Sequence, residues 1–343
     1  MPLTEHSQHL RQLQEPVGTG FTAYSTAQEV MQGIDLTDVN AIVTGGHSGL
    51  GLAVTRALSA AGAWVTVAAR DPRRAKRALV GVRRVEIEQL DLLVPESVEA
   101  FAARYRREGR PVDLLVNHAG IPATGGLDHD RRGYETRFAA NHLGHFQLTL
   151  GLLPVLLASG RARVVTTTSG AHRHSGILWD DPHFRTDRHD PALAYAQSKT
   201  ANVLFTRELD RLWGDAGVRA FAPHPGIVAD TRFNRSAGDD VRRALGIVDG
   251  TGAAIIDPPS GRKTIDQGAA TILVAATSPL LEHRGGVYLA DGDVATLDPG
   301  TGTTHPQAGV APHAVDPEAA RRLWELSARL ITRSPRDLFS LAV

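Results

Sequence analysis

Short apolar runs alternate with longer amphipathic stretches through most of the chain. The apolar runs cover residues 40–44, 64–69, 85–90, 112–117, 163–167 and 219–222. Their lack of a regular polar position at every second residue predicts strands that are buried on both faces. Helical patterns of about ten residues or more separate them. This order predicts βαβ units and a parallel sheet.

The predicted fold is therefore α/β, a doubly wound parallel sheet with helices on both faces. We assign residues 36–295 to a single domain of this kind, preceded by an N-terminal extension (1–35) and followed by a C-terminal loop and helix extension (296–343). Within the first extension, Ser25 or Thr26 can cap a helix that has Glu29 in its first turn. The Gly-rich and Asp-rich segments 230–263 and 291–314 predict long loops at the end of the sheet.

The composition excludes several classes of protein. The 37 Lys and Arg residues are balanced by 37 Asp and Glu residues, so the formal net charge is zero. No overall positive field attracts nucleic acid, and we expect no nucleic-acid partner. The chain of 343 residues has no cysteine, which excludes disulfide scaffolds, thiolate nucleophiles and Cys-ligated metal sites. Chemistry must therefore use other side chains or a cofactor.

The sequence also predicts neither a secretory signal nor a membrane span. Near the start of the chain, Glu5, Arg11 and Glu15 interrupt any apolar segment of the kind that a signal peptide needs. The longest apolar stretch contains Gly151 and Pro154 and is shorter than the roughly 20 residues that cross a bilayer. The expected location is the cytoplasm.

A glycine-rich turn follows the first predicted strand and opens the next helix. Glycines at 45, 49 and 51 permit a tight turn, close approach of the backbone to a pyrophosphate, and close packing of the helix on the strand. The N–H groups at the start of the helix can bind phosphate. The candidate cofactor contacts in this turn are Gly45, His47, Ser48, Gly49, Leu50 and Gly51.

The spacing Thr-Gly-x-x-x-Gly-x-Gly resembles the fingerprint of the short-chain dehydrogenase/reductase family. Four further motifs follow in the order of that family: Asp91-Leu92, Asn117-His118-Ala119-Gly120, Tyr195-Ala196-Gln197-Ser198-Lys199, and Pro225-Gly226-Ile227-Val228-Ala229-Asp230-Thr231. The resemblance covers about residues 36–290 and departs at His118, where the family usually has a second Asn. It implies a Rossmann-type fold. Segments 141–146 and 201–206 are similar to the branch that holds retinol dehydrogenases and light-dependent protochlorophyllide reductase.

The choice of cofactor can be argued from charge at the end of the second predicted strand. A site selective for NAD places a carboxylate there, but this chain has Ala69 followed by Arg70. A guanidinium at Arg70, with a second at Arg74 one helical turn later, suits the 2′-phosphate of NADP(H). Asp71 is a competing signal, and a solvated basic helix face is the alternative reading of these arginines.

Tyr195 and Lys199 are four residues apart, so they share one face of a helix. A phenol is a weak acid near neutral pH, and a neighbouring cation favours its phenolate form. Lys199 is therefore expected to lower the pKa of Tyr195. A phenol with a pKa tuned in this way can give a proton to a developing alkoxide, or take one from an alcohol.

The resemblance implies roles for further residues. Ser169 would bind the substrate oxygen, and Asn141 would hold a water that links Lys199 to solvent, which completes a catalytic tetrad with Tyr195. The remaining cofactor contacts that it implies are Asp91, Leu92, Asn117, Ala119, Gly120, Tyr195, Lys199, Pro225, Gly226, Val228 and Thr231.

These observations predict an NADP(H)-dependent oxidoreductase that reduces a ketone or aldehyde, or oxidises the corresponding alcohol. The expected partner is a lipophilic small molecule, and a homo-oligomer is left open. Two alternatives also remain: reduction of a C=C bond, and a protein that binds NADP without turnover. The histidines at 172, 174, 183 and 189 lack a regular ligand spacing, so we expect no metal. His118, His142 and His145 are expected to be hydrogen-bonded structural residues.

Overall fold

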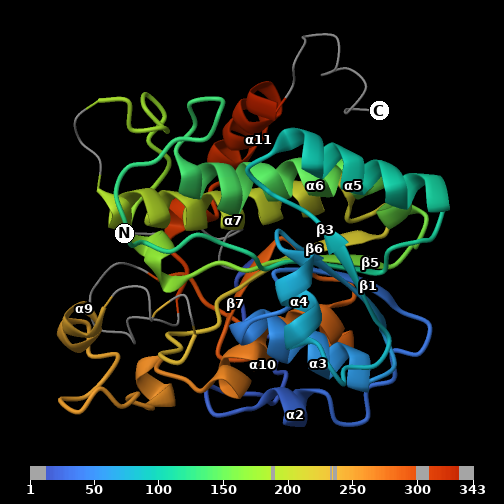
Figure 1. Cartoon of the computed structure of the whole chain (residues 1–343), viewed down its shortest axis with the longest axis horizontal. Coiled ribbons are helices and arrows are strands. Elements are labelled where there is room, and N and C mark those ends of the chain that lie inside the picture. The colour runs from blue at the N-terminus through green and yellow to red at the C-terminus, as the bar shows by residue number, and fades with distance from the viewer. Residues whose placement is uncertain (1–12, 187–189, 232–233, 235–237, 299–308, 332–343) are drawn as a thin grey trace, which may run out of the picture.

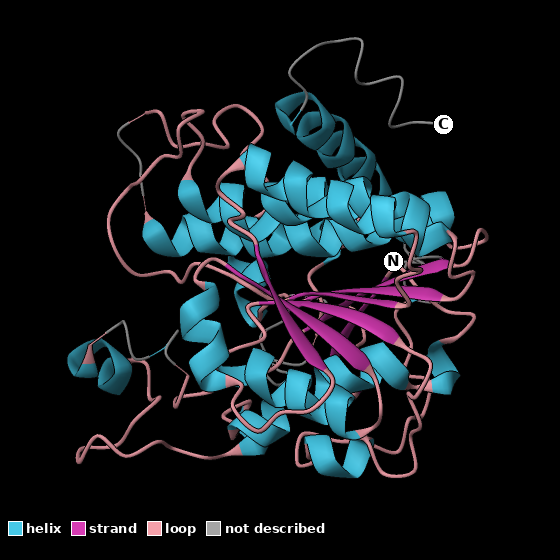
Figure 2. Cartoon of the chain, turned by 45° about the vertical axis from the view of Figure 1, so that its right-hand side comes forward, coloured by secondary structure: helices cyan, strands magenta, loops and turns pink. Residues whose placement is uncertain are grey.

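A twisted central sheet with helices on both faces forms the middle of the protein (Figures 1 and 2). The computed structural model describes residues 13–186, 190–231, 234, 238–298 and 309–331. Within these residues the sheet has eight strands in the order β3-β2-β1-β4-β5-β6-β7-β8. All neighbouring strands are parallel except β7 and β8. The predicted Rossmann-type α/β fold is therefore confirmed.

The bounds of the first six strands follow the six predicted apolar runs closely. The strands are β1 (Asn40–Thr44), β2 (Trp64–Ala69), β3 (Val85–Gln89), β4 (Leu114–Asn117), β5 (Ala162–Thr166), β6 (Val218–Pro223), β7 (Val287–Ala290) and β8 (Asp293–Val294). Ala41 and Val43 of β1 contribute to the core on one side of the sheet, and Ile42 contributes to the core on the other side. Burial on both faces explains why this strand has no alternating polar positions.

The sequence interpretation missed the last two strands. β7 is a run of four residues that pairs with β6 through Ala222 and Tyr288, and β8 turns back to pair with it. A run this short is ambiguous by periodicity alone, and the antiparallel β8 has only two residues. Their pairing depends on an edge that the rest of the sheet provides.

Two layers of helices cover the sheet. The helices are α2 (Ala27–Val30), α3 (Gly49–Ala60), α4 (Pro72–Ala78), α5 (Pro95–Glu108), the π-helix η1 (Phe138–Leu143), α6 (Gly144–Leu157), α7 (Pro191–Trp213), α9 (Asp239–Ala244), α10 (Ile265–Thr277) and α11 (Pro317–Ile331). Residues of α2, α3, α4 and α10 share one core with the sheet, and residues of α5, α6 and α7 share the other. In Figure 1 these sets lie below and above the sheet. Across the described part of the chain, none of the helices has the length and apolar character needed to cross a membrane.

The segment before β1 is attached to the far edge of the sheet. The carboxylate of Asp293 accepts hydrogen bonds from the backbone N–H groups of Val17, Gly18 and Thr19 at 2.9–3.1 Å. The predicted helix start is also present, because Thr26 and Glu29 form a reciprocal capping box at α2. These bonds hold the start of the described chain against the β7–β8 hairpin.

Helix α11 packs on the outer side of α6 and α7. Its Trp324 lies 4.8 Å from Phe146, 5.9 Å from Phe205 and 5.5 Å from Trp213, measured between ring centroids. A partly buried aromatic cluster therefore joins the C-terminal helix to the helices that carry the candidate site.

Replacing Trp324 with Ala should destabilise the protein by about 2–3 kcal/mol, because the aromatic contacts disappear and a cavity remains. Urea denaturation followed by circular dichroism measures this change. The matched control is Arg321→Ala on the exposed face of the same helix, which should change the free energy of unfolding by less than about 0.5 kcal/mol. Equal effects of the two substitutions would show that α11 adds nothing to the stability of the domain.

Candidate functional site

The predicted site residues gather at the carboxyl ends of the strands, where the strand order reverses. β1 lies between β2 and β4, so the chain leaves β1 and β4 in opposite directions. The Thr44 hydroxyl at the end of β1 accepts hydrogen bonds from the N–H groups of His118 (2.8 Å) and Ala119 (3.0 Å) in the loop after β4. In open α/β sheets, ligands bind in the crevice at such a reversal.

Backbone geometry explains the glycines in the turn after β1. Gly45 and Gly49 have φ values of 69° and 51°, a conformation that side chains with a Cβ rarely adopt. A Cβ on Gly51 would lie 2.6 Å from the carbonyl oxygen of Gly45, so any side chain there would force the helix away from the turn. The predicted roles of glycine in the tight turn and in close packing agree with this geometry.

The first turn of α3 has donors that suit an anion. Ser48 is the N-cap residue, but its side chain makes no capping hydrogen bond, and the first turn contains no acidic residue. The leading N–H groups of an α-helix have no partner within the helix. Uncapped donors at the positive end of a helix dipole fit the pyrophosphate of a dinucleotide.

The segment 225–231 packs beside this turn. A Cβ built on Gly268 would lie 2.7 Å from the side chain of Val228 and 2.8 Å from that of Leu50. A Cβ built on Gly49 would lie 3.5 Å from the methyl group of Thr231. The Pro225-Gly226 corner, with φ of 81° at Gly226, leads the chain toward the start of α3. Two motifs separated by more than half of the chain therefore form one wall.

The loops after β3 and β4 form further parts of the wall. The amide of Asn117 donates to Thr149 (3.1 Å), and a Cβ on Gly120 would lie 3.2 Å from Asn141 Oδ1 and 3.9 Å from Lys199 Nζ. Asp91 accepts from the N–H of Leu93 at 3.0 Å, which shapes the turn that carries Leu92. Gly120 thus joins the cofactor side of the candidate site to its catalytic side.

Arg70 and Arg74 lie at the end of β2 and in the first turn of α4. Asp71, the competing signal, is the N-cap residue of α4, and its carboxylate accepts a hydrogen bond from the N–H of Arg74 at 3.1 Å. Arg70 is exposed, and Arg74 is partly exposed. Among the described residues neither guanidinium forms an ion pair, so both remain available to a phosphate.

Tyr195, Ser169 and Lys199 lie together on the catalytic side. Tyr195 and Lys199 occupy successive turns of α7, and Lys199 Nζ lies 5.6 Å from the centre of the Tyr195 ring. Ser169, at the start of the 3₁₀ turn η2 (Gly170–His174), shares a hydrogen bond with Tyr195. Lys199 Nζ donates to the carbonyl oxygen of Thr167 at 3.1 Å, and this bond fixes the ammonium group.

Asn141 lies in η1, where the helix widens to π geometry just before α6. Its amide donates to the carbonyl of Ile121 (3.1 Å) and to the hydroxyl of Ser198 (3.0 Å), and its Oδ1 accepts from the N–H of Ile121 (2.7 Å). π-Helical turns occur frequently at functional sites. Ser198 was missed as a site residue, although its place between Tyr195 and Lys199 in the motif was a signal.

Burial sets the proton affinity of the catalytic pair. Loss of hydration raises the pKa of Tyr195 to about 12, although the hydrogen bond with Ser169 acts in the opposite direction. Burial also lowers the pKa of Lys199 to about 8. The expected lowering of the Tyr195 pKa by Lys199 does not prevail in the protein alone, because desolvation of the phenolate is the larger effect. Tyr195 is therefore protonated at neutral pH.

The histidines after β4 have structural roles, as predicted. His145 Nδ1 contacts the carbonyl of Asn141 (3.0 Å) and must donate, so Nε2 accepts from the Thr44 hydroxyl at 2.9 Å. His142 contacts Ser327 of α11 at 2.7 Å, and His118 contacts Thr167 at 3.1 Å.

The histidines of the 172–189 segment are dispersed. His172 is buried beside Ser169, His174 is exposed, and His183 stacks on Tyr134 at 4.5 Å. His189 lies outside the described residues. No group of His, Asp or Glu side chains in the described ranges is arranged to hold a metal ion.

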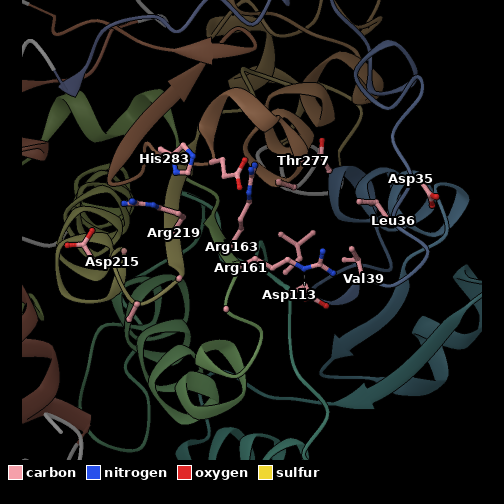
Figure 3. Close-up of a pocket in the computed structure, with 17 residues that line it drawn as sticks. Asp35, Leu36, Val39, Asp113, Arg161, Arg163, Asp215, Arg219, Thr277 and His283 are labelled. Atoms are coloured by element: carbon pink, nitrogen blue, oxygen red, sulfur yellow. Dashed lines mark hydrogen bonds and ion pairs between the residues drawn. The ribbon is translucent and has the colours of Figure 1, made fainter.

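A pocket of about 790 Å³ lies at the opposite edge of the sheet, among the amino ends of the strands (Figure 3). Two of its arginines already pair with carboxylates of the protein. Arg161 pairs with Asp113 at 3.4 Å, and Arg219 pairs with Asp210 at 3.0 Å. None of the predicted site residues lines it. We therefore place the candidate site at the carboxyl edge, where the fold and the glycine-rich turn are typical of dinucleotide-binding α/β proteins.

Comparisons with known proteins assign the family. The model of the short chain dehydrogenase family matches residues 39–242. A "Probable oxidoreductase" of Streptomyces lividans is 44% identical over 301 residues, which cover 86% of this chain and 98% of that protein. The chloroplastic short-chain dehydrogenase TIC 32 A of Brassica napus is 33% identical and covers 92% of this chain and 96% of its own length.

A solved structure agrees with this assignment. The crystal structure of an uncharacterized protein from Mycobacterium paratuberculosis has a TM-score of 0.66 and 32% identity, and covers 91% of this chain and 97% of that chain. The chain belongs to the short-chain dehydrogenase/reductase family, whose members are oxidoreductases that bind a nicotinamide cofactor.

The buried histidines predict a loss of stability in weak acid. Burial lowers the pKa of His142 to about 3, of His145 to about 4 and of His172 to about 3. Between the ordinary pKa near 6.5 and these values, the unfolded chain binds protons that the native protein does not. The free energy of unfolding should therefore fall as the pH falls from 6.5 toward 4, by up to about 1.4 kcal/mol per pH unit for each imidazole.

Urea denaturation at a series of pH values measures this slope. In His142→Phe the slope should decrease by the contribution of about one proton, whatever the change in absolute stability. The matched control, His174→Phe at an exposed position, should leave the slope unchanged. A stability that is flat from pH 6.5 to 4 would contradict the buried, neutral state of these rings.

Proposed function

We propose that the protein is an NADP(H)-dependent oxidoreductase that reduces a ketone or aldehyde, or oxidises the corresponding alcohol, with Asn141, Ser169, Tyr195 and Lys199 as its catalytic residues. The observation that carries this proposal is the grouping of Tyr195, Ser169 and Lys199 beside Gly120, on the wall shared with the glycine-rich turn. A proton donor and a dinucleotide cradle at one edge of the sheet suit carbonyl reduction.

Each catalytic side chain has a separate task. The Ser169 hydroxyl binds the substrate oxygen, and the Tyr195 hydroxyl gives that oxygen a proton as the carbonyl becomes an alcohol. Lys199 stabilises the phenolate that remains, and Asn141 holds the backbone of the adjoining loop at Ile121 directly while it also donates to Ser198 of α7. A bound nicotinamide would supply or accept the hydride at the carbonyl carbon. In the reverse direction Tyr195 takes the proton from the alcohol.

The residues that hold the dinucleotide are proposed from the same wall. The turn from Gly45 to Gly51 and the start of α3 would bind the pyrophosphate, and the loops at 91–92, 117–120 and 225–231 would contact the remainder. The guanidinium groups of Arg70 and Arg74 form no ion pair with a carboxylate among the described residues, which supports binding of a 2′-phosphate. The substrate is proposed to be a lipophilic small molecule, and a homo-oligomer remains compatible with this function.

Replacing Tyr195 with Phe should lower kcat for carbonyl reduction by at least roughly a hundredfold, because the variant keeps the ring but has no proton to give. The affinity for NADPH, measured by fluorescence titration, should stay within about twofold of the wild-type value. Tyr24→Phe, at an exposed tyrosine, is the matched control and should keep full activity. If Tyr195→Phe retains most of its turnover, another group supplies the proton.

Wild-type protein should bind NADPH more tightly than NADH, and Arg70→Ala should weaken NADPH binding by about 1.5–3 kcal/mol, the usual worth of a charge-assisted phosphate contact. Arg74→Ala should act in the same direction. NADH affinity should not change in either variant, because NADH lacks the 2′-phosphate. Dissociation constants from isothermal titration calorimetry decide this, with the exposed Arg77→Ala on α4 as control. Equal affinities of the wild type for both cofactors would refute the assignment.

A further inference from the structure

His172 connects the turn that carries Ser169 to the C-terminal segment of the chain. The ring is fully buried and lies in the first turn after the serine. Its Nδ1 is 2.7 Å from the carbonyl oxygen of Ser169, and its Nε2 is 3.1 Å from the backbone nitrogen of Ala311. The two partners are separated by 142 positions in sequence but meet through this one side chain.

The backbone partners determine the tautomer of His172. The N–H of Ala311 can only donate, so Nε2 carries no proton and accepts this bond. The carbonyl of Ser169 can only accept, so Nδ1 carries the proton and donates it. The neutral Nδ1–H imidazole satisfies both bonds at once. Burial keeps the ring in this form, since it lowers the pKa of His172 to about 3.

Further bonds hold the backbone of His172 itself. Its carbonyl oxygen accepts from His313 Nε2 at 2.9 Å and lies 2.9 Å from the hydroxyl of Thr200, whose single proton is shared with the carbonyl of Ser175 at 2.6 Å. Thr200 follows Lys199 on α7, and His313 lies in the 3₁₀ turn η5 (Pro312–Ala314). The residue is therefore held from the catalytic helix on one side and from the C-terminal segment on the other.

The position of the Ser169 carbonyl affects the Ser169 hydroxyl. Ser169 has an extended backbone (φ −154°, ψ 154°), and its side chain accepts from the N–H of Ala171 at 3.2 Å. Rotation of the Ser169–Gly170 peptide would also displace the next peptide, which carries the Ala171 N–H, and so reorient the hydroxyl that shares a hydrogen bond with Tyr195. The Ser169 carbonyl accepts two hydrogen bonds from His172, one from the backbone N–H at 3.1 Å and the shorter one from the ring Nδ1 at 2.7 Å, and only the second depends on the side chain.

We propose that His172 is a positioning residue for Ser169, and that it makes the C-terminal segment around Ala311 and His313 a working part of the active site. This inference rests on the proposed function of Ser169. His172 does not touch the reacting atoms. It orients the serine hydroxyl by holding the adjoining peptide, and the C-terminal segment in turn holds the imidazole.

Two substitutions separate the two hydrogen bonds of the ring. In His172→Asn the amide nitrogen can take the place of Nδ1 and donate to Ser169, but the contact with Ala311 is lost. In His172→Gln the amide oxygen can take the place of Nε2 and accept from Ala311, but the side-chain donor to Ser169 is lost. The exposed neighbour His174→Gln is the matched control. All variants are made in the full chain and compared with the wild type.

The readouts are kcat and KM for carbonyl reduction, the dissociation constant of NADPH, and thermal stability. In His172→Gln we expect kcat to fall by at least about tenfold, with the NADPH dissociation constant unchanged, because a misplaced catalytic group affects the chemical step. His172→Asn should recover most of that kcat even where its melting temperature is the lower of the two. A purely structural role would instead make activity follow stability. Wild-type kcat in His172→Gln, or equal losses in both variants, would overturn the proposal.

Hydrogen–deuterium exchange tests the hydrogen bond from the His172 ring to the Ser169 carbonyl without any substrate. The amides of residues 170–172 should exchange faster in His172→Gln than in His172→Asn or His174→Gln, since opening of this turn then breaks only the backbone bond to Ser169 and no longer the side-chain bond as well. If the wild-type protein turns over no carbonyl compound, the proposed function fails. The exchange result still decides whether His172 holds the Ser169 turn in place. Unchanged exchange in His172→Gln would refute the positioning of the Ser169 turn by His172.

Discussion

The Thr44 hydroxyl joins the two halves of the sheet at the point where the strand order reverses. It accepts hydrogen bonds from two backbone N–H groups in the loop after β4 and donates one to Nε2 of His145. Nδ1 of His145 in turn donates to the carbonyl of Asn141. This buried chain of bonds places the turn after β1, the loop at 118–120 and the π-helix at fixed positions. The candidate cofactor wall and the catalytic side chains therefore share one anchor.

Neutral, buried polar side chains hold the backbone around the candidate site. His145 fixes the π-helix, His172 fixes the Ser169 turn, and Asn141 fixes the loop at Ile121. A charged group at these positions would require hydration that the interior does not provide. Lys199 is itself buried at the site, and burial lowers its pKa to about 8. Such a shift beside a proton donor is typical of functional sites.

Much of the fold and the site could be predicted from local pattern. β2 begins and ends at the expected residues, and Gly51 stands where only a glycine allows α3 to pack against the turn. The spacing of Tyr195 and Lys199 predicts their common helix face. By contrast, β7 was missed because four apolar residues carry little periodic signal. The predicted direction of the pKa shift of Tyr195 was also wrong. The spacing of the two residues reveals the neighbouring cation, but it does not reveal how much water the fold removes from the phenol.

The sequence by itself determined the first six strands, the glycine positions and the pairing of Tyr195 with Lys199, because each depends on residues a few positions apart and on the backbone geometry that those residues allow. Only the tertiary structure decided that Ala311 meets His172, that α11 covers α6 and α7, and that Thr231 lies beside Gly49. These contacts join residues far apart in the chain. They form because the order of the strands brings these residues together, and because the apolar surfaces that remain exposed on the sheet and helices become buried when other segments pack on them.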